Sequence, residues 1–483
     1  MRLASVLPVF CSLFGLALAE SKNAAELAKI KVAFPNRDSQ YMFRIKKGLK
    51  ALSEQGGQPV VKKEEFEFEG ENQDSTTAFE DEILAANKHL SEYLHEGDIL
   101  LTPSDVNRML SGRSKRNTLN GELDPSVRWE IDRPIPYRFL RSIGPQTAQL
   151  IRKALKVWEN NTCLQFQENG YAKGTTEIIF YDGSGCFSSV GKQYNSLNQT
   201  ISIGPGCSFM NIVHEIGHTL GMNHAHTRID RDEYVYIYQD RIDPGIYKLN
   251  FQKQNRSSNY NYGVRYDYGS IMHYAPTAFA KVEGQTTIVA RKDSQNNLKT
   301  MGQRTDFAFS DFWLINLHHK CIDKCVTYKT NCTNGYPDPK NCWKCKCPAG
   351  FSGRFCNQRD QGDDTRNCGK IVVAKSKPQT LSGTIGRNIH AEFPEMRCYF
   401  HINAPKGRRI RVTLKSITSP QCDSRCNYGH TEFKMGDPRY HGFRFCCWSD
   451  PKNQWFDSEK NQVVISMRSA WHYQGFVVEY QMI

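Results

Sequence analysis

One stretch of the chain reads His214-Glu215-Ile216-Gly217-His218-Thr219-Leu220-Gly221-Met222-Asn223-His224, the pattern H-E-x-x-H-x-x-G-x-x-H. Histidines four residues apart lie one above the other on the same face of a helix. Gly221 tolerates a positive φ, so the helix can end in a sharp turn that brings His224 back as a third ligand. Three neutral imidazoles leave one position of a zinc ion open, as in catalytic rather than structural sites. Glu215 can then take a proton from a water at that position.

A bare H-E-x-x-H also occurs by chance on solvated helix surfaces, so those five residues alone leave both interpretations open. The extension to Gly221 and His224 is much harder to reach by accident, and apolar residues precede and interrupt the motif. We therefore predict a buried helix that carries a zinc site, with His214, His218 and His224 as the ligands.

A second element lies downstream, at Ser270-Ile271-Met272-His273-Tyr274. Met272 can form an apolar, polarizable floor beneath the imidazoles, although a lone methionine is ordinary core filling. A methionine turn under the metal accompanies the extended histidine motif in the metzincin proteases. The role predicted for Met272 is structural.

The histidine motif and the methionine turn, together with residues 227–232, resemble the astacin family of zinc endopeptidases. The resemblance extends over roughly residues 117–321. The likeness includes Pro134-Ile135-Pro136-Tyr137 and the stretch 186–191. It implies one Zn²⁺ per subunit, with Glu215 as the general base on a zinc-activated water and Tyr274 stabilising the oxyanion. It also implies a two-lobed fold, with a mixed sheet in one lobe and irregular chain in the other.

One position departs from the family pattern. Astacins usually have Glu directly after the third histidine, where it receives the new N-terminus of the mature enzyme. This chain has Ala225, which cannot anchor an ammonium group. The metal ligands and Glu215 are unaffected, and His226 is not expected to be a ligand. A silent adhesion or scaffold protein on a protease fold is the alternative, but it predicts loss of a ligand or of Glu215, and neither is lost.

The chain is 483 residues long, which is enough for three or four domains. A hydrophobic run from Leu3 to Leu18 ends in Ala17-Leu18-Ala19, which predicts a signal peptide over residues 1–19. No later apolar run of about 20 residues is present, so no membrane span is expected. The predicted location is therefore secreted and extracellular.

Secretion fits the cysteines and the glycosylation signals. The chain has 17 cysteines, and the 16 that follow Cys11 are expected to form disulfides. Four asparagines begin N-x-S/T sequons and are predicted glycosylation sites: Asn160, Asn198, Asn255 and Asn331. The net charge of +13 favours acidic matrix, glycans or membrane surfaces over nucleic acid. The basic residues form no continuous block along the chain, so an ordinary solvated surface remains the simpler interpretation of this charge.

Residues 20–116 have the features of a propeptide. They contain no cysteine and end in Arg113-Ser114-Lys115-Arg116, a basic cluster at which a processing protease would cut after Arg116. Apolar spacing over residues 79–94 predicts a helix. Asp98, which follows Gly97, resembles the aspartate with which astacin-type propeptides block the zinc; the alternative is an ordinary surface turn.

The remaining cysteines fall into three groups. The astacin resemblance implies the pairs Cys163–Cys321 and Cys186–Cys207. Six cysteines crowd residues 325–356, and their last stretch resembles an EGF-like module, which implies Cys347–Cys356. Zinc binding by these thiols is an alternative that export from the cell disfavours. The last 116 residues have short alternating strands and resemble a CUB β-sandwich, which implies Cys368–Cys398. Other pairings in these two modules stay open, since six cysteines allow 15 connectivities.

The sequence thus predicts a multidomain α+β protein. The expected parts are a signal peptide (1–19), a propeptide (20–116), a two-lobed metzincin protease domain (117–321), an EGF-like module (322–357) and a CUB β-sandwich (368–483). The expected activity is zinc-dependent hydrolysis of peptide bonds by a secreted zymogen. The domain order resembles nematode astacin-like proteases, which implies substrates in extracellular matrix or cuticle.

Overall fold

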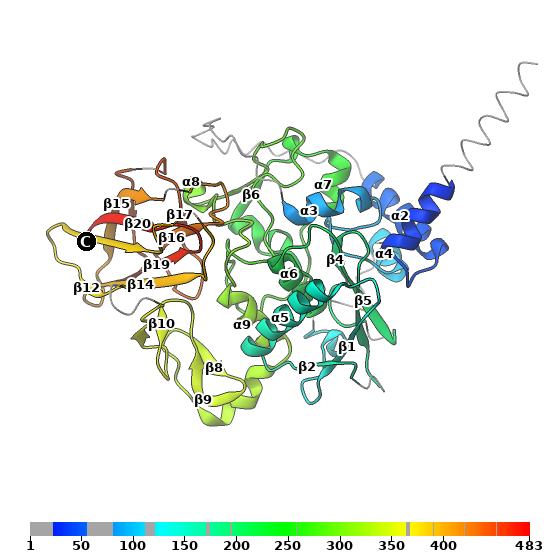
Figure 1. The fold of residues 1–483 in the computed structure, drawn as a ribbon, viewed down its shortest axis with the longest axis horizontal. Coiled ribbons are helices and arrows are strands. Elements are labelled where there is room, and N and C mark those ends of the chain that lie inside the picture. The colour runs from blue at the N-terminus through cyan, green and yellow to red at the C-terminus, as the bar shows by residue number, and fades with distance from the viewer. Residues whose placement is uncertain are drawn as a thin grey trace, which may run out of the picture.

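The computed structural model describes residues 23–55, 81–111, 121–170, 174–193, 196–256, 258–363, 368–389, 391–419, 421–450 and 452–483. They form four parts, which follow one another from blue to red in Figure 1: the N-terminal segment (23–111), the central body (121–321), the cysteine-rich module (322–363) and the C-terminal sandwich (368–483). The predicted signal peptide and the cluster that ends at Arg116 lie outside the described residues. Of the helices in the described ranges, none has the length and apolar character that a membrane span needs.

The central body begins with a five-stranded sheet. Its strand order is β2-β1-β3-β5-β4, and all neighbours are parallel except β4, which runs antiparallel to β5 at one edge. The strands are β1 (Ile135–Phe139), β2 (Phe166–Glu168), β3 (Glu177–Tyr181), β4 (Cys186–Ser188) and β5 (Asn198–Ile203). Branched and aromatic side chains dominate β3 and β5, and such residues suit a half-buried pleated surface. The mixed sheet agrees with the expectation from the sequence.

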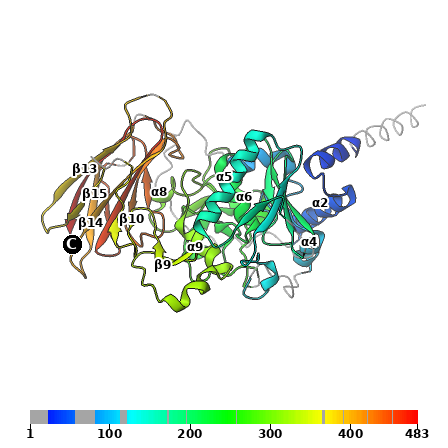
Figure 2. The same cartoon turned by 60° about the horizontal axis from the view of Figure 1, so that its bottom comes forward.

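Two helices, α5 (Pro145–Asn161) and α6 (Phe209–Thr219), pack on one another beside this sheet (Figure 2). Proline at the first position of α5 suits a helix start, because its fixed φ is helical and no amide is lost. The indole of Trp158 on α5 is fully buried and donates a hydrogen bond to the Val213 carbonyl of α6, at 3.1 Å. The α6 helix, which carries the histidine motif, is therefore held between α5 and the sheet.

Regular structure is sparse after α6, as the sequence analysis expected. The elements are β6 (Val235–Ile237), α7 (Pro244–Asn250), β7 (Ile288–Ala290), α8 (Ser294–Asn297) and α9 (Phe309–His318). Strands β6 and β7 form a two-stranded ribbon, and α9 closes the central body. The expected disulfide Cys163–Cys321 is present and joins the end of α5 to the end of α9. Cys186–Cys207 is present too and ties β4 to the start of α6.

The N-terminal segment packs against the edge of the sheet. Residues 23–33 are helical, and three further helices follow: α2 (Ser39–Glu54), α3 (Glu82–Asn87) and α4 (Pro103–Leu110). Phe34 and Tyr93 form a buried cluster with Phe187 of β4. The helix predicted over residues 79–94 is shorter in the structure, because α3 ends at Asn87 and a single 3-10 turn follows.

The cysteine-rich module consists of two small antiparallel pairs. Its strands are β8 (Tyr336–Asp338), β9 (Asn341–Lys346), β10 (Phe351–Ser352) and β11 (Gln358–Arg359). The expected Cys347–Cys356 disulfide is present, together with Cys325–Cys342 and Cys332–Cys345. Three bridges in so short a stretch replace the hydrophobic core that it is too small to form.

The C-terminal sandwich has two facing sheets, of order β12-β14-β19-β16-β17 and β13-β20-β15-β18 (Figure 2). Its strands are β12 (Ile371–Val373), β13 (Gln379–Ile385), β14 (Met396–Asn403), β15 (Ile410–Thr418), β16 (Gly429–Lys434), β17 (Phe443–Phe445), β18 (Trp455–Asp457), β19 (Gln462–Ser469) and β20 (Gln474–Met482). Alternate residues of both sheets fill the core between them. The expected Cys368–Cys398 bridge is present, with Cys422–Cys447 and Cys426–Cys446 in addition.

Candidate metal centre

Helix α6 and the turn after it bring three histidines together. His214 and His218 lie one turn apart, with their ring centroids 4.6 Å and their Nε2 atoms 3.0 Å from one another. Gly221 then ends the helix with a φ of +108°, and a Cβ at this position would lie 2.7 Å from the His318 imidazole. Only glycine satisfies both conditions. The turn places the ring of His224 4.7 Å from that of His218.

Each of the three imidazoles has its Nδ1 atom held by an oxygen acceptor. The contacts are His214 with the Ile271 carbonyl at 2.8 Å, His218 with the Met222 carbonyl at 2.7 Å and His224 with the Glu96 carboxylate at 2.8 Å. Because an oxygen acceptor holds the proton on Nδ1, the neutral form of each imidazole carries its lone pair on Nε2. The three lone pairs face a common point, which is the arrangement expected of metal ligands.

Asp98 of the N-terminal segment takes the fourth place at this point. Its Oδ2 atom lies 3.2 Å from Nε2 of both His214 and His224, and its Oδ1 atom lies 3.5 Å from Nε2 of His218. The residue is 1% exposed, so the alternative of an ordinary surface turn does not hold. Gly97 has a φ of +75°, and this turn aims the carboxylate at the imidazoles.

The chemistry of this donor set fits zinc. The four ligand atoms of Asp98, His214, His218 and His224 lie within 4.8 Å of one another. Ligands of a tetrahedral zinc ion are separated by roughly 3.3 Å, close to the distances found here. Oδ1 of Asp98 is buried and has no hydrogen-bond partner among the described residues. When the three imidazoles are neutral, their lone pairs and the Asp98 carboxylate need a cation between them, which a zinc ion would supply.

Burial and charge act in opposite directions on Asp98. Burial raises the pKa of its carboxyl, but the positive charge of His224 and His218, when these imidazoles hold a proton instead of a metal ion, outweighs that effect and holds the pKa well below its usual value. Asp98 is therefore a carboxylate in this site, which is the form that can bind a metal ion.

Glu215 lies beside the ligands and is fully buried. Its Oε2 atom accepts a hydrogen bond from the Ser188 hydroxyl at 2.9 Å, and its Oε1 atom has no partner among the described residues. Burial first, and then the charge of Asp98, raise the pKa of Glu215 well above its usual value. A carboxyl that is oriented by one hydrogen bond and readily holds a proton can act as a general base and then as an acid.

Tyr274 lies against the third ligand. Its ring is 4.7 Å from that of His224 and stacks on His226 at 3.7 Å. Its hydroxyl donates a short hydrogen bond to the Glu96 carbonyl of the N-terminal segment. His226 is buried and bonded to the Asn250 carbonyl at 2.9 Å, so it supports Tyr274 and is not a ligand, as expected.

The turn at residues 270–274 is fixed by Asp311 of α9. The Asp311 carboxylate accepts hydrogen bonds from the Ser270 hydroxyl at 2.7 Å and from the Ile271 amide at 2.9 Å. The same turn supplies the Ile271 carbonyl that holds the first histidine. Met272 is fully buried, and a Cβ on Gly217 of the metal helix would lie 3.2 Å from its sulfur. Met272 thus lies against the metal helix, and its role as an apolar floor beneath the imidazoles stays a prediction.

The N-terminal segment also covers the edge strand β4. The Ser188 amide donates to the Asp98 carbonyl at 3.0 Å, and the Leu100 amide donates to the Ser188 carbonyl at 2.8 Å. The Asn87 side chain accepts from the Cys186 amide at 2.8 Å and donates to the Cys186 carbonyl at 2.5 Å. The segment therefore occupies both the metal position and the edge strand beside it.

Three participants were missed by the sequence analysis: Glu96, Ser188 and Asp311. Ser188 lies within the stretch 186–191, which was quoted without a role for it. The sequence indicated no role for Glu96 or Asp311. The contacts that give these residues their roles join segments far apart in the chain, and no local pattern marks them.

The four sequon asparagines lie on or near the surface. Asn160, Asn255 and Asn331 are exposed, and Asn198 is half-buried at the start of β5. Their glycosylation remains a prediction.

Comparison with known proteins places this site in context. A family model described as Astacin, a peptidase family, matches residues 122–320. The zinc metalloproteinase nas-27 of Caenorhabditis elegans is 31% identical over 412 residues, which are 82% of this chain and 91% of that protein. The zinc metalloproteinase nas-28 of the same organism is 31% identical over 426 residues, which are 86% of this chain and 83% of that protein.

Solved structures give two further likenesses. High choriolytic enzyme 1, a hatching enzyme zinc-protease from the medaka fish Oryzias latipes, is 29% identical with a TM-score of 0.37, covering 41% of this chain and 96% of that one. The CUB1-EGF-CUB2 domain of human MASP-1/3 is 16% identical with a TM-score of 0.19, covering 28% of this chain and 52% of that one.

Proposed function

The chain belongs to the astacin family of zinc metalloproteinases, and from this premise we propose that it is a secreted zymogen whose mature form hydrolyses peptide bonds with Glu215 as the general base. The observation that carries the proposal is the meeting of His214, His218 and His224 with Asp98 at one buried point. Three ligands come from the body of the protein and the fourth from a segment that a single cut would release. The proposed zinc site thus has all four of its ligands, but the N-terminal segment covers it.

The chemistry follows from the residues around the metal position. Zinc held by His214, His218 and His224 supplies a Lewis acid that polarises a carbonyl and lowers the pKa of a water. Glu215 accepts a proton from the attacking water and delivers it to the leaving amine. The Ser188 hydroxyl keeps the Glu215 carboxylate in the orientation that both transfers need.

Tyr274 acts on the substrate oxygen. In the covered state its hydroxyl is bonded to the Glu96 carbonyl, so release of the N-terminal segment leaves that hydroxyl without its present acceptor. A phenol beside a developing oxyanion donates a hydrogen bond that strengthens as the negative charge grows. Asp311 supports this role, because it fixes the turn from which Tyr274 projects.

Latency follows from the same contacts. Asp98 fills the position that a catalytic water needs, and the pairing of the N-terminal segment with β4 covers the strand beside it. The charge of Asp98 also raises the pKa of Glu215, so removal of the segment restores a stronger tendency of Glu215 to ionise. We propose that a processing protease cuts after Arg116 and releases residues 20–116.

The proposed organisation places this enzyme outside the cell. Residues 1–19 are proposed as the signal peptide, 117–321 as the protease domain, 322–357 as an EGF-like module and 368–483 as a CUB domain. The eight disulfides of the described residues support an oxidising compartment. Proteins of extracellular matrix or cuticle are the proposed substrates, which the two C-terminal modules would help to select.

A cleavage assay on the processed, zinc-loaded chain tests the proposal. The wild-type protein is expected to cut denatured gelatin, to lose activity to a chelator and to regain it with zinc. Glu215→Ala is expected to lower kcat by roughly 100- to 10,000-fold, the range for removal of a general base. Glu283→Gln, at an exposed carboxylate of the same domain, is the matched control and is expected to keep full activity. Undiminished activity in Glu215→Ala would refute the mechanism, and a silent wild type would favour the scaffold alternative.

A further inference from the structure

The carboxylate of Glu82, on helix α3 of the N-terminal segment, is held by donors from two other parts of the chain. Its Oε1 atom pairs with Nη1 of Arg425 at 2.9 Å, and its Oε2 atom accepts from the amide nitrogen of Asn211 at 3.3 Å. Each oxygen thus has one donor. Arg425 belongs to the C-terminal sandwich and Asn211 to the metal helix, so the two donors form a carboxylate-binding pair across a domain boundary.

Asn211 ties this pair to the catalytic centre. It stands one turn before His214 on α6 and is fully buried. It therefore belongs to the same buried helix as the metal ligands. A carboxylate that binds Asn211 lies beside the helix on which the reaction takes place.

Arg425 is presented by a stapled loop. Cys422 and Cys426 flank it and are bonded to the adjacent cysteines Cys447 and Cys446. The Asp423 carboxylate accepts from the Arg425 amide at 2.8 Å, so this acid is engaged with backbone inside the loop. The Arg425 guanidinium is 15% exposed and points out of the loop to Glu82. Two disulfides fix the backbone of this loop independently of the N-terminal segment.

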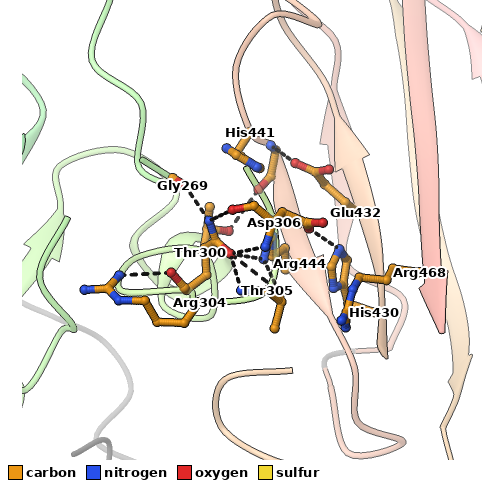
Figure 3. A network of polar contacts seen from close by, with 12 residues as sticks. Gly269, Thr300, Arg304, Thr305, Asp306, His430, Glu432, His441, Arg444 and Arg468 are labelled. Atoms are coloured by element: carbon orange, nitrogen blue, oxygen red, sulfur yellow. Dashed lines mark hydrogen bonds and ion pairs between the residues drawn. The ribbon is translucent and has the colours of Figure 1, made fainter. Parts of the chain in front are cut away.

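The sandwich that carries the loop is docked on the central body by a buried polar network (Figure 3). Asp306 of the central body pairs with Arg444 at 2.7 Å, with His430 at 3.1 Å and with Arg397 at 2.5 Å. The Arg444 side chain is fully buried and also donates to Thr305 at 3.1 Å. These contacts involve no residue of the N-terminal segment, so they persist after its removal.

A second group of contacts extends this interface. The His441 amide donates to Asp267 at 3.2 Å, and Thr300 donates to the Gly442 carbonyl at 2.9 Å. Gly269 is required here, because a Cβ on it would lie 2.3 Å from the His441 ring. The interface therefore fixes where Arg425 lies relative to the metal helix.

We propose that Arg425 and Asn211 form a substrate-binding site for an acidic side chain, which Glu82 fills in the latent protein. Removal of residues 20–116 takes away Glu82 and leaves both donors facing the same place. The C-terminal sandwich then contributes directly to cleavage specificity, through one charged residue at a fixed position. This inference rests on the proposed function, because it requires that the segment be removed and that substrate take its place.

Digestion of a synthetic peptide library by the processed, zinc-loaded full chain tests the site. The wild type is expected to favour Asp or Glu at one position near the scissile bond. Twin peptides that differ only in having Glu or Gln at that position then give the ratio of kcat/KM for the Glu peptide to kcat/KM for the Gln peptide. Arg425→Ala is expected to lower this ratio roughly fivefold, as for a partly exposed ion pair. Arg425→Lys is expected to keep most of the ratio. Arg425→Glu is expected to shift the preference to Lys at the same position.

Arg411→Ala is the matched control, since Arg411 is also an ion-paired arginine of the sandwich, bonded to Asp457. It is expected to leave the ratio unchanged. An equal Glu-to-Gln ratio in wild type and Arg425→Ala, with both proteins cutting the library, would overturn the site. A second readout is binding of the same twin peptides to processed chain carrying Glu215→Ala. The ratio of the Kd values of the two peptides is expected to change by the same factor of roughly five when Arg425→Ala is added. An unchanged ratio would overturn the site even if the proteolytic function failed.

Discussion

Two carboxylates of the N-terminal segment, Asp98 and Glu82, are both held by later parts of the chain, but in different surroundings. Asp98 is 1% exposed and faces three imidazoles. The Glu82 side chain is 33% exposed and meets one guanidinium and one amide. Electrostatic interactions strengthen where water is excluded and weaken where it enters. The strong contact therefore lies where the chemistry takes place, and the weak one where a substrate side chain can replace it.

The two contacts also differ in what they require of the fold. Every partner of Asp98 in the metal centre comes from the short stretch His214–His224. The partners of Glu82 come from two domains, so its contact with Arg425 exists only while the sandwich is docked on the central body. Four changes test these differences.

The largest effect is expected from Asp98→Ala in a chain that also carries Arg116→Ser and cannot be processed. Without the carboxylate, water can enter the metal position, and loss of a buried charged partner costs about 3–5 kcal/mol. The uncut chain is expected to gain roughly 100-fold or more in activity, measured with a quenched peptide while gel analysis confirms that the chain is intact. Glu92→Ala removes an exposed carboxylate of the same segment and is expected to stay latent. An Asp98→Ala chain as silent as its parent would contradict the assignment.

Asp306→Asn tests the docking that positions Arg425. It leaves the buried Arg444 without its carboxylate and is expected to destabilise the sandwich interface by about 3 kcal/mol. Faster proteolysis and faster amide exchange in β16 and β17 would report the change. Asp457→Asn breaks a partly exposed pair with Arg411 and is expected to cost much less stability than Asp306→Asn. Equal effects of the two variants would show that the buried network does not hold the domains together.

Acid is expected to weaken the same interface through His430. Burial, and then the charge of Arg444, lower the pKa of His430 to about 4, and its Nδ1 atom has no partner among the described residues. A histidine with a lowered folded-state pKa contributes stability above its unfolded pKa of about 6.5, and this is lost as pH falls toward the folded value. The expected loss is about 2 kcal/mol at pH 5.

Denaturant unfolding followed from pH 7.5 to pH 5 measures this effect. His430→Gln removes the titrating group and is expected to flatten the pH dependence by about that amount. If the free energy of unfolding of the variant depended on pH as steeply as that of the wild type, the loss of stability at low pH would come from other histidines.

The smallest effect is expected from Glu82→Gln. It weakens a partly exposed contact by up to about 1 kcal/mol, so amide exchange in α3 is expected to rise about fivefold. The amides around Asp98 are expected to keep their protection, because their contacts lie within the central body. If the amides of α3 and those around Asp98 lost protection together, the contacts of Glu82 and Asp98 would open as one unit.

Much of the fold was predictable where a local pattern carries the physics. The apolar spacing of residues 147–160 is typical of a helix, and α5 forms there; the branched runs at 177–181 and 199–203 are typical of strands, and β3 and β5 form there. Residues 79–94 show where spacing misleads. The helix there ends at Asn87, whose side chain is bonded to Cys186 of β4. A contact between residues so distant in the chain leaves no mark in local periodicity.

The candidate site divides in the same way. The three ligands and Glu215 were predicted from spacing, since two histidines on one helix face and a glycine turn suffice to describe a metal site. Asp98 was predicted from its resemblance to the aspartate of astacin-type propeptides. The supporting residues were not: Ser188 reaches Glu215 and Asp311 fixes the turn under the metal only after the chain has folded. A carboxyl or hydroxyl alone in a sequence has many possible partners, and packing selects one.

The metal chemistry could therefore be predicted from the sequence, because ligand type and spacing within eleven residues are local properties. That an aspartate after a glycine could cover the metal was predicted from the resemblance to astacin-type propeptides. The meeting of Arg425 and Asn211 at Glu82 depends on the tertiary structure. These distant residues are brought together by disulfides and by the buried charges at Asp306, and such long-range pairing depends on the whole fold.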